Sequence, residues 1–312
     1  MIIGIVLTLL LAVLAITLYC YHVAFYVPPR KPQPEGFIDV PPGKVYEPFY
    51  PQMRAWALEN QTRKQEHFSI KSFDGLTLWG TYYEYAPGAP MELMFHGYRG
   101  NAQRDLPGGV QRCFACGRSA FIVDQRCSGR SQGKTITFGI HERRDCLAWV
   151  DFLVDHFGPD VKIILTGISM GAATVVMAGG EELPPNVIGI LADCGYHSQK
   201  EIMLKIAGEM GFPPKLCYPF VKLAARLFGG FDLEETTPVE ALKKVKVPVI
   251  FFHGEDDDFV PCYMSRKMYD ACPGRKEIHT VPGADHGLSY PMDMDGYVAR
   301  VKTFFHPDIS RG

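Results

Sequence analysis

Residues 161–178, which read VKIILTGISMGAATVVMA, indicate the fold of this chain. They begin with a short apolar run that is typical of a buried strand, and they end with small apolar residues in a helical pattern. Ser169 lies between the two, flanked by Gly167 and Gly171. A serine on a sharp turn from a strand into a helix projects its hydroxyl, and the two glycines leave room for the neighbouring backbone. The pattern therefore predicts that Ser169 is a nucleophile.

Short apolar runs on both sides of this stretch alternate with helical patterns. We expect strands at 92–95, 120–123, 161–165, 187–192, 247–252 and 277–281. Such alternation predicts a mostly parallel central sheet with helices on both faces. A helix at 52–66 and a β-hairpin over 68–85, turning at Asp74 and Gly75, are expected before it. In sheets of this kind functional side chains collect at the carboxyl ends of the strands.

A serine hydroxyl needs a base that takes its proton and a third group that orients this base. His286 follows the last predicted strand in the glycine-flanked segment 282–287, PGADHG. The acid candidates are four consecutive carboxylates in HGEDDDFVP at 253–261, after the strand at 247–252, and Asp193, after the preceding strand. We predict that His286 is the base, while the residues alone leave the choice of acid open.

Residues 95–100, FHGYRG, end an early strand and resemble the oxyanion loop of the α/β-hydrolase superfamily. The order of this loop, the serine, the acid segment and the histidine is similar to that family. Its details resemble the carboxylesterase and prolyl-oligopeptidase-like (S9-like) branch in a bacterial-type, membrane-anchored form. Residues 123–131 resemble a structural D-x-R-G-x-G-x-S segment, with Cys127 where glycine is usual. The resemblance covers roughly 68–305 and implies an α/β-hydrolase fold with a mostly parallel sheet, helices on both faces and a small helical cap.

The resemblance also implies roles for single residues. The segment at 253–261 is similar to the family pattern H-G-x-x-D-x-x-V-P, and this register makes Asp257 the acid, with Asp193 as the runner-up. The backbone N–H groups of Tyr98 and Met170 are expected to form the oxyanion hole, whereas their side chains are expected to matter less.

Membership of this family implies hydrolysis of esters, thioesters or amides through an acyl-enzyme, without a cofactor. We expect a serine hydrolase, most simply a carboxylesterase, that acts on a small-molecule acyl ester. An apolar insertion at 196–242 stands where relatives carry a cap, and with the tether it suggests lipid-like esters; packing without substrate contact is its alternative role. The alternatives for the whole chain are a peptidase or amidase of the same fold, and a catalytically inactive membrane-anchored binding protein.

The first 29 residues contain no Lys, Arg, Asp or Glu, and residues 2–18 are almost wholly aliphatic. Such a segment can cross a hydrocarbon layer of about 30 Å. We predict a transmembrane anchor at 1–26 rather than a cleaved signal peptide, whose basic n-region is missing. Recurring prolines over 27–51 predict an extended linker that holds the enzyme off the bilayer. The hydrolase domain is then expected at 52–312, with the cap insertion at 196–242.

Two features favour a cytoplasmic catalytic domain on a single-pass membrane protein. Arg30 and Lys31 follow the apolar segment and are kept inside by the positive-inside rule. The nine cysteines lie mostly in apolar stretches, and buried free thiols are typical of a reducing compartment. Cys113 and Cys116 form a C-x-x-C without a second ligand pair at zinc spacing, so we expect no metal site.

The overall composition is that of a globular protein, with 47% hydrophobic and 21% charged residues. The net charge is -2, and the basic residues are scattered among nearly equal numbers of acids. A nucleic-acid partner is therefore not expected. Nothing in the sequence indicates an oligomeric state.

Overall fold

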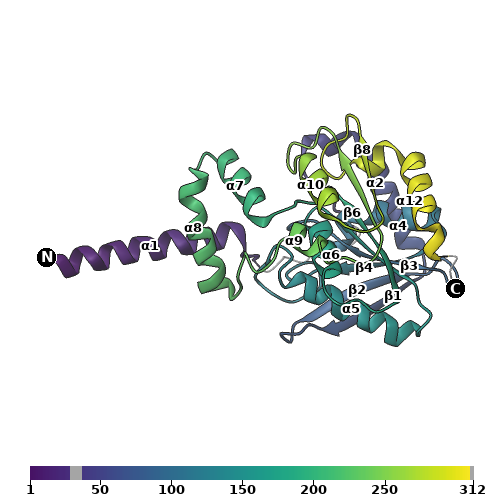
Figure 1. Cartoon of the computed structure of the whole chain (residues 1–312), viewed down its shortest axis with the longest axis horizontal. Coiled ribbons are helices and arrows are strands. Elements are labelled where there is room, and N and C mark those ends of the chain that lie inside the picture. Colours follow the sequence, from purple (N-terminus) through teal and green to yellow (C-terminus); the bar gives the residue numbers. More distant parts are fainter. Residues whose placement is uncertain (29–36, 310–312) are drawn as a thin grey trace.

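The computed structural model describes residues 1–28 and 37–309, whose strands form one eight-stranded sheet (Figure 1). The strands follow the order β1-β2-β4-β3-β5-β6-β7-β8. β2 is antiparallel to both of its neighbours, and the other adjacent pairs are parallel. The predicted mostly parallel sheet is therefore confirmed. The strands are β1 (Gln65–Lys71), β2 (Thr77–Tyr83), β3 (Met91–Phe95), β4 (Ser119–Asp124), β5 (Ile163–Ile168), β6 (Val187–Asp193), β7 (Val249–Gly254) and β8 (Lys276–Val281).

Helices cover both faces of the sheet. Successive side chains of a central strand point to opposite sides, and because these side chains are apolar, both faces have to be buried. In β5, Ile163 and Leu165 pack in one apolar cluster, while Ile164 packs in a cluster on the other face. Strands buried on both faces read as continuous apolar runs, which is why the sequence revealed them. The covering helices are α4 (Pro107–Ala115) and α12 (Met294–Ile309) on one face and α5 (Glu142–Phe157), α6 (Met170–Gly179) and α10 (Tyr263–Ala271) on the other.

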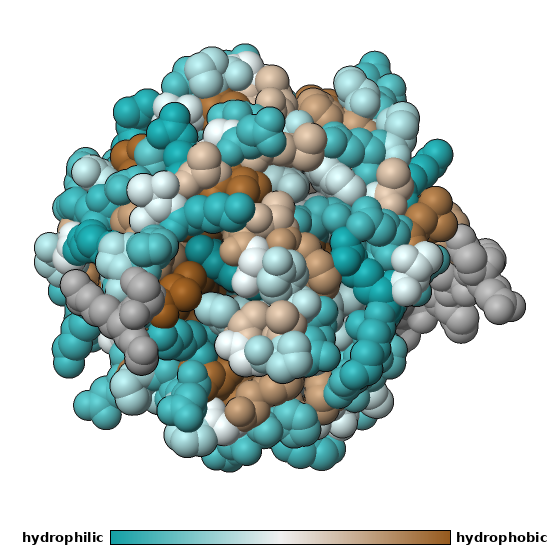
Figure 2. All heavy atoms as spheres, turned by 90° about the vertical axis from the view of Figure 1, so that its right-hand side faces the viewer, coloured by the Kyte–Doolittle hydropathy of each residue, from teal (hydrophilic) through white to brown (hydrophobic). Residues whose placement is uncertain are grey.

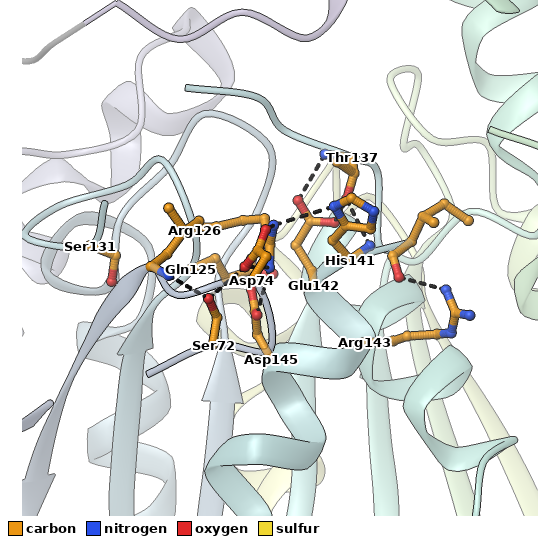
Figure 3. A network of polar contacts seen from close by, with 12 residues as sticks. Ser72, Asp74, Gln125, Arg126, Ser131, Thr137, His141, Glu142, Arg143 and Asp145 are labelled. Atoms are coloured by element: carbon orange, nitrogen blue, oxygen red, sulfur yellow. Dashed lines mark hydrogen bonds and ion pairs between the residues drawn. The ribbon is translucent and has the colours of Figure 1, made fainter. Parts of the chain in front are cut away.

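A buried polar network ties the turn between β1 and β2 to α5 (Figure 3). Arg126, two residues after the end of β4, donates two hydrogen bonds of 2.7 Å to the carboxylate of Asp145 and a third of 3.0 Å to Asp74 in the turn. The side chains of Arg126 and Asp145 are almost fully buried. Removing one partner of such a pair leaves the other charge buried without a counter-charge, which lowers the free energy of unfolding by about 3–5 kcal/mol. This architecture agrees with the structural role implied for 123–131.

The helix α1 (Ile2–Ala24) is long and apolar enough to be a candidate transmembrane span. Its exposed first part points away from the sheet, and its end packs against α8 (Figure 1). α7 (Gln199–Glu209), α8 (Pro214–Ala224) and the π-helical turn η2 (Ala225–Gly229) lie beside the end of α1. The inserted helices thus stand next to the candidate anchor.

The described part of the segment over 27–51, for which an extended linker is predicted, includes helical residues and a backbone contact with the loop after β4. Phe25 is fully buried at the end of α1, and the Val27 amide donates to the Lys134 carbonyl at 2.9 Å. Further along, the 3₁₀ helix η1 (Lys44–Phe49) leads directly into α2 (Tyr50–Thr62). Residues 29–36, including Arg30 and Lys31, on which the predicted orientation depends, lie outside the described residues.

Candidate active site

The turn that carries Ser169 joins β5 to α6 in a backbone conformation that few residues adopt. Ser169 has φ 57° and ψ -120°, and such values in a residue with a side chain cost of order 1–3 kcal/mol. Close backbone contacts at the two flanking glycines hold Ser169 in this conformation. A Cβ on Gly167 would lie 2.1 Å from the Gly171 carbonyl oxygen, and a Cβ on Gly171 would lie 2.1 Å from the Phe95 carbonyl oxygen. Only glycine fits at both positions, so β3, β5 and α6 meet beneath the serine.

Three loops bring Ser169, His286 and Asp257 together at the carboxyl edge of the sheet. The His286 Nε2 atom lies 2.9 Å from the Ser169 Oγ atom, and the His286 Nδ1 atom lies 2.7 Å from the Asp257 Oδ2 atom. The carboxylate accepts a hydrogen bond from Nδ1–H, which leaves the lone pair of Nε2 free to accept the proton of the serine hydroxyl. The arrangement has the geometry in which an imidazole activates a serine.

Asp257 is held by more than its contact with His286. Its Oδ1 atom accepts the Val260 amide at 2.7 Å, and its Oδ2 atom lies 3.1 Å from the His253 Nε2 atom. Burial raises the pKa of Asp257, but hydrogen bonds from His253 and His286 outweigh burial and bring the pKa to about 2. The carboxylate is therefore charged at neutral pH.

His253 is a supporting residue that the sequence did not single out for this role. It is fully buried, its Nε2 atom lies 2.6 Å from the Val260 carbonyl oxygen, and its Nδ1 atom lies 2.6 Å from the Ser265 hydroxyl. Both oxygens beside Nε2 are acceptors, so Nε2 carries the proton and Nδ1 accepts from Ser265. The signal for this role was present in the sequence as the first residue of HGEDDDFVP.

Asp193, the alternative acid, has other partners. Its oxygens accept from the Ser289 hydroxyl at 3.2 Å and from the Tyr297 hydroxyl at 2.9 Å, and His286 is not among its recorded partners in the described part of the chain. Burial raises the pKa of Asp193. The structure therefore brings Asp257, and not Asp193, to the histidine.

The two predicted oxyanion donors lie at a loop and a helix start. Tyr98 follows β3, and Met170 is the first residue of α6, where amides lack acceptors within the helix. Among the described residues neither amide has a recorded protein acceptor. A Cβ on Gly97 would lie 3.5 Å from the Ser169 Cβ, so this loop runs against the serine. Both amides are available for a ligand in this part of the structure.

Buried polar contacts hold the loop at 95–100, which carries the predicted oxyanion donor Tyr98. The His96 Nδ1 atom lies 2.8 Å from the Gly97 carbonyl oxygen, and its Nε2 atom accepts the Gln125 amide at 3.1 Å. The Gln125 side chain in turn donates to the His96 carbonyl at 2.6 Å. Burial lowers the pKa of His96, so the ring is neutral and Nδ1 carries its proton. The loop is thereby tied to the end of β4.

A cavity of about 640 Å³ opens beside Ser169 and His286. Its walls are mostly apolar and include residues 41–56, residues 104–112, the ends of β3 and β5, and the start of the short helix α11 (Ser289–Met292). None of its lining residues lies in 196–242. In the described part of the chain this insertion therefore does not line the cavity, which favours its alternative role of packing without substrate contact. The segment expected to be a spacer forms part of the wall instead.

One group of side chains near the site has metal-binding atoms close together. Ligand atoms of Cys194, Asp257 and His286 lie within 4.8 Å of one another. Burial raises the pKa of the Cys194 thiol well above its usual range, and metals bind the thiolate rather than the thiol. His286 and Asp257 are also hydrogen-bonded to each other, so the group fits a serine-activating site better than a metal site.

The sequence of this chain is similar to those of known proteins. The protein-family sequence model described as "Alpha/beta hydrolase family" matches residues 93–301. The uncharacterized protein YqkD of Bacillus subtilis is 27% identical over 60% of this chain and 62% of its own length. Protein bem46 of Schizosaccharomyces pombe is 23% identical over 63% and 61%, and the uncharacterized membrane protein YNL320W of Saccharomyces cerevisiae is 25% identical over 60% and 61%. The matches thus span about three fifths of these relatives.

Solved structures share the fold. An esterase of Pyrococcus furiosus, Pf2001, superposes with a TM-score of 0.66 at 20% identity and covers 87% of this chain and 98% of its own. The esterase Est1E of Butyrivibrio proteoclasticus, solved with ferulic acid, superposes with a TM-score of 0.60 at 20% identity over 78% of this chain and 100% of its own. At sequence identities this low the superpositions show a shared fold, and they do not indicate the substrate of this chain.

Proposed function

The chain belongs to the alpha/beta hydrolase family, and from this premise we propose that it is a serine hydrolase that cleaves ester-like acyl bonds. The observation that carries the proposal is the continuous chain of hydrogen bonds from Ser169 through His286 to Asp257. Ser169 is the nucleophile, His286 the general base and Asp257 the group that orients and stabilises the imidazolium. A serine without a chemical role would not require a turn with unfavourable backbone angles between two glycines in close backbone contact.

The residues support a two-step reaction. His286 takes the proton of the Ser169 hydroxyl as the oxygen attacks the acyl carbon, and the amides of Tyr98 and Met170 donate to the oxygen that becomes negative. His286 then gives its proton to the departing alkoxide. A water attacks the acyl-enzyme by the same route in reverse, and the free acid leaves. Each proton moves between groups of the chain, the substrate and water.

The cavity supports an ester with an apolar acyl chain as the substrate. Its volume is within the range of small-molecule sites, and Met53, Trp56, Met94, Leu106 and Ile168 provide apolar walls. We therefore propose a carboxylesterase for small, lipid-like esters, in the carboxylesterase and prolyl-oligopeptidase-like branch of bacterial type. A peptidase or amidase of the same fold is the second candidate, because the same serine chemistry cleaves amides.

We also propose that α1 anchors the enzyme as a single membrane span, with the catalytic domain in the cytoplasm. The length and apolar composition of α1 support the anchor. The nine free cysteines support a reducing compartment. In this division residues 1–26 form the anchor and the hydrolase domain follows from residue 52. Digestion of the catalytic domain by protease added outside intact cells would contradict the orientation.

Labelling with a fluorophosphonate probe tests the catalytic proposal. The wild-type chain and a Ser69→Ala control, which alters an exposed serine in β1, should label equally, and Ser169→Ala should not label. Labelling of Ser169→Ala at the wild-type level would remove Ser169 from the mechanism. An unlabelled wild-type chain would favour the inactive binding protein.

A panel of p-nitrophenyl esters and matching p-nitroanilides then separates the substrate classes. An apolar acyl pocket predicts that kcat/KM rises from acetyl to medium-chain esters and stays low for the anilides. Preference for acetyl esters would exclude the lipid-like proposal, and efficient cleavage of anilides would favour the amidase.

A further inference from the structure

The inserted helices pack on α1 rather than over the cavity. The rings of Tyr19 and Phe212, at the turn between α7 and α8, lie 6.5 Å apart, and those of Tyr21 and Phe228, in η2, lie 5.7 Å apart. Figure 1 shows α8 running across α1 rather than along it. We call α7, α8 and η2, residues 199–229, the hairpin. Its contacts place it around the last turns of the candidate membrane helix.

The hairpin has an apolar stripe that faces solvent. Leu216, Phe220, Leu223 and Leu227 follow one another at helical spacing along α8 and η2. Leu216 and Leu227 are 66% and 59% exposed, and Phe220 is half-buried. The turn from α7 adds exposed Met210 and Phe212. In contrast, the face of the molecule opposite α1 is mostly hydrophilic with scattered apolar residues (Figure 2). A grouped apolar surface of this kind indicates an interaction site.

The length of the exposed part of α1 indicates where the bilayer lies relative to this stripe. The exposed residues 2–16 rise by about 22 Å, at about 1.5 Å per residue, whereas a hydrocarbon core is about 30 Å thick. A bilayer crossed by α1 must therefore also enclose the next turns of the helix. Thr17 is already fully buried there, and Tyr19 contacts Phe212. The hairpin consequently reaches the boundary of the same bilayer.

We propose that the hairpin is a second membrane contact, in which α8 lies in the interfacial layer of the bilayer with Leu216, Leu223 and Leu227 toward the acyl chains. A helix that crosses a membrane-spanning helix lies along the membrane plane, which is the orientation of an interfacial amphipathic helix. The inference rests on the proposed anchor and is independent of the catalytic proposal. It also explains why these residues are absent from the cavity wall.

Quenching of tryptophan fluorescence by brominated lipid tests the contact. The full chain is reconstituted in phosphatidylcholine vesicles with or without bromine on the acyl chains, and the signal added by each new tryptophan is compared. Leu216→Trp and Leu227→Trp report on the hairpin, and Leu10→Trp reports on α1. Leu58→Trp is the matched control, since Leu58 is an exposed leucine of a helix distant from α1.

The proposal predicts that brominated lipid quenches both hairpin reporters, with a loss approaching that of Leu10→Trp, and leaves Leu58→Trp unchanged. Quenching of Leu10→Trp alone would overturn the proposal, and it would indicate that the apolar stripe binds a protein partner rather than lipid. Absence of quenching at Leu10→Trp would overturn it together with the anchor. Fluorophosphonate labelling of each variant, measured in the same vesicles, keeps these results separate from any failure of the catalytic proposal.

Discussion

Asp257 receives hydrogen bonds from two histidines, and this makes its charge part of the stability of the fold. Its pKa is about 2, against an ordinary value of 3.8. A lowered carboxyl pKa adds stability that is complete above the ordinary pKa and is lost as the pH falls through the lowered one. The shift corresponds to about 2 kcal/mol.

We therefore expect Asp257→Asn to be less stable than the wild type near neutral pH and to lose this disadvantage in acid. The difference in the free energy of unfolding should shrink by about 2 kcal/mol between about pH 6 and pH 2. Denaturant unfolding in detergent over this range measures it. Asp256→Asn, at the exposed neighbour, serves as the control. A difference that does not change with pH would show that the carboxylate is not stabilised by its partners.

The contacts of the two candidate acids also predict opposite effects on turnover. Asp257→Asn should lower kcat by about 10⁴-fold, because the amide favours the wrong tautomer of His286. Asp193→Asn should keep kcat within tenfold and lower the free energy of unfolding by about 1–3 kcal/mol, since one of the two buried hydroxyls loses its acceptor and meets an amide donor instead. Steady-state kinetics and denaturant unfolding of both variants decide between them. The reverse pattern would make Asp193 the catalytic acid.

At this scale the sequence singled out Ser169, Asp257 and His286, which the structure brings together, and their catalytic roles stay predictions. Each follows a recognisable strand, so its place at the sheet edge could be inferred. The role of His253 could not, because a buried histidine beside a carboxylate is defined by contacts between loops. The cavity wall was missed for the same reason.

At the scale of elements, the oxyanion loop is joined to the end of α1. The Tyr98 hydroxyl donates to the Ala24 carbonyl at 2.8 Å, and Arg99 donates to the Val23 and Tyr26 carbonyls at 2.9 and 3.1 Å. The last carbonyls of a helix lack partners within it, and a cation there also favours the helix dipole. The Tyr98 side chain, which was expected to matter less, therefore links the candidate anchor helix to the proposed oxyanion hole.

Tyr98→Phe should lower kcat several-fold with little change in KM, because the amide that meets the transition state loses its support while the cavity keeps its shape. The lost hydrogen bond should also reduce the free energy of unfolding by about 1 kcal/mol. Kinetics on a soluble ester test this, with Tyr85→Phe, at an exposed tyrosine, as the control. Equal kcat for Tyr98→Phe and the wild type would mean that α1 does not position the loop.

The elements themselves were largely predictable, and the errors have local causes. The run at 247–252 contains Pro248, which lacks an N–H, and β7 begins only at Val249. The prolines over 27–51 were interpreted as a spacer. Yet Pro51 stands in the first turn of α2, a position that proline favours, and Pro48 lies within η1. Counting prolines does not distinguish a helix start from a linker.

At the scale of the whole molecule, the candidate anchor and the hydrolase form one packed structure. The Tyr21 hydroxyl lies 2.7 Å from the Thr135 hydroxyl, and Tyr26 forms a β-bridge with Thr135. Cleavage of α1 as a signal peptide would remove Tyr21 and the carbonyls that hold Tyr98 and Arg99. These contacts support the proposal that the helix is retained, and with α1 in a membrane they would keep the hydrolase fold close to the bilayer.

Phe25 is the residue on which this coupling can be tested. Its ring is fully buried and makes edge contacts with Phe138 at 5.9 Å and Phe231 at 5.3 Å. Phe25→Ala should reduce the free energy of unfolding of the catalytic domain by about 3–5 kcal/mol, because truncation leaves a cavity between the two rings. Phe37→Ala, at an exposed phenylalanine, should change it by no more than about 0.5 kcal/mol.

Denaturant unfolding in detergent, followed through loss of fluorophosphonate labelling at Ser169, compares the two variants. Labelling reports on the catalytic domain alone, so a large effect of Phe25→Ala would place the end of α1 within the cooperative unit that holds the site. Equal effects of Phe25→Ala and Phe37→Ala would instead make the anchor an independent attachment. In that case the contacts of α1 with the oxyanion loop would contribute little to stability.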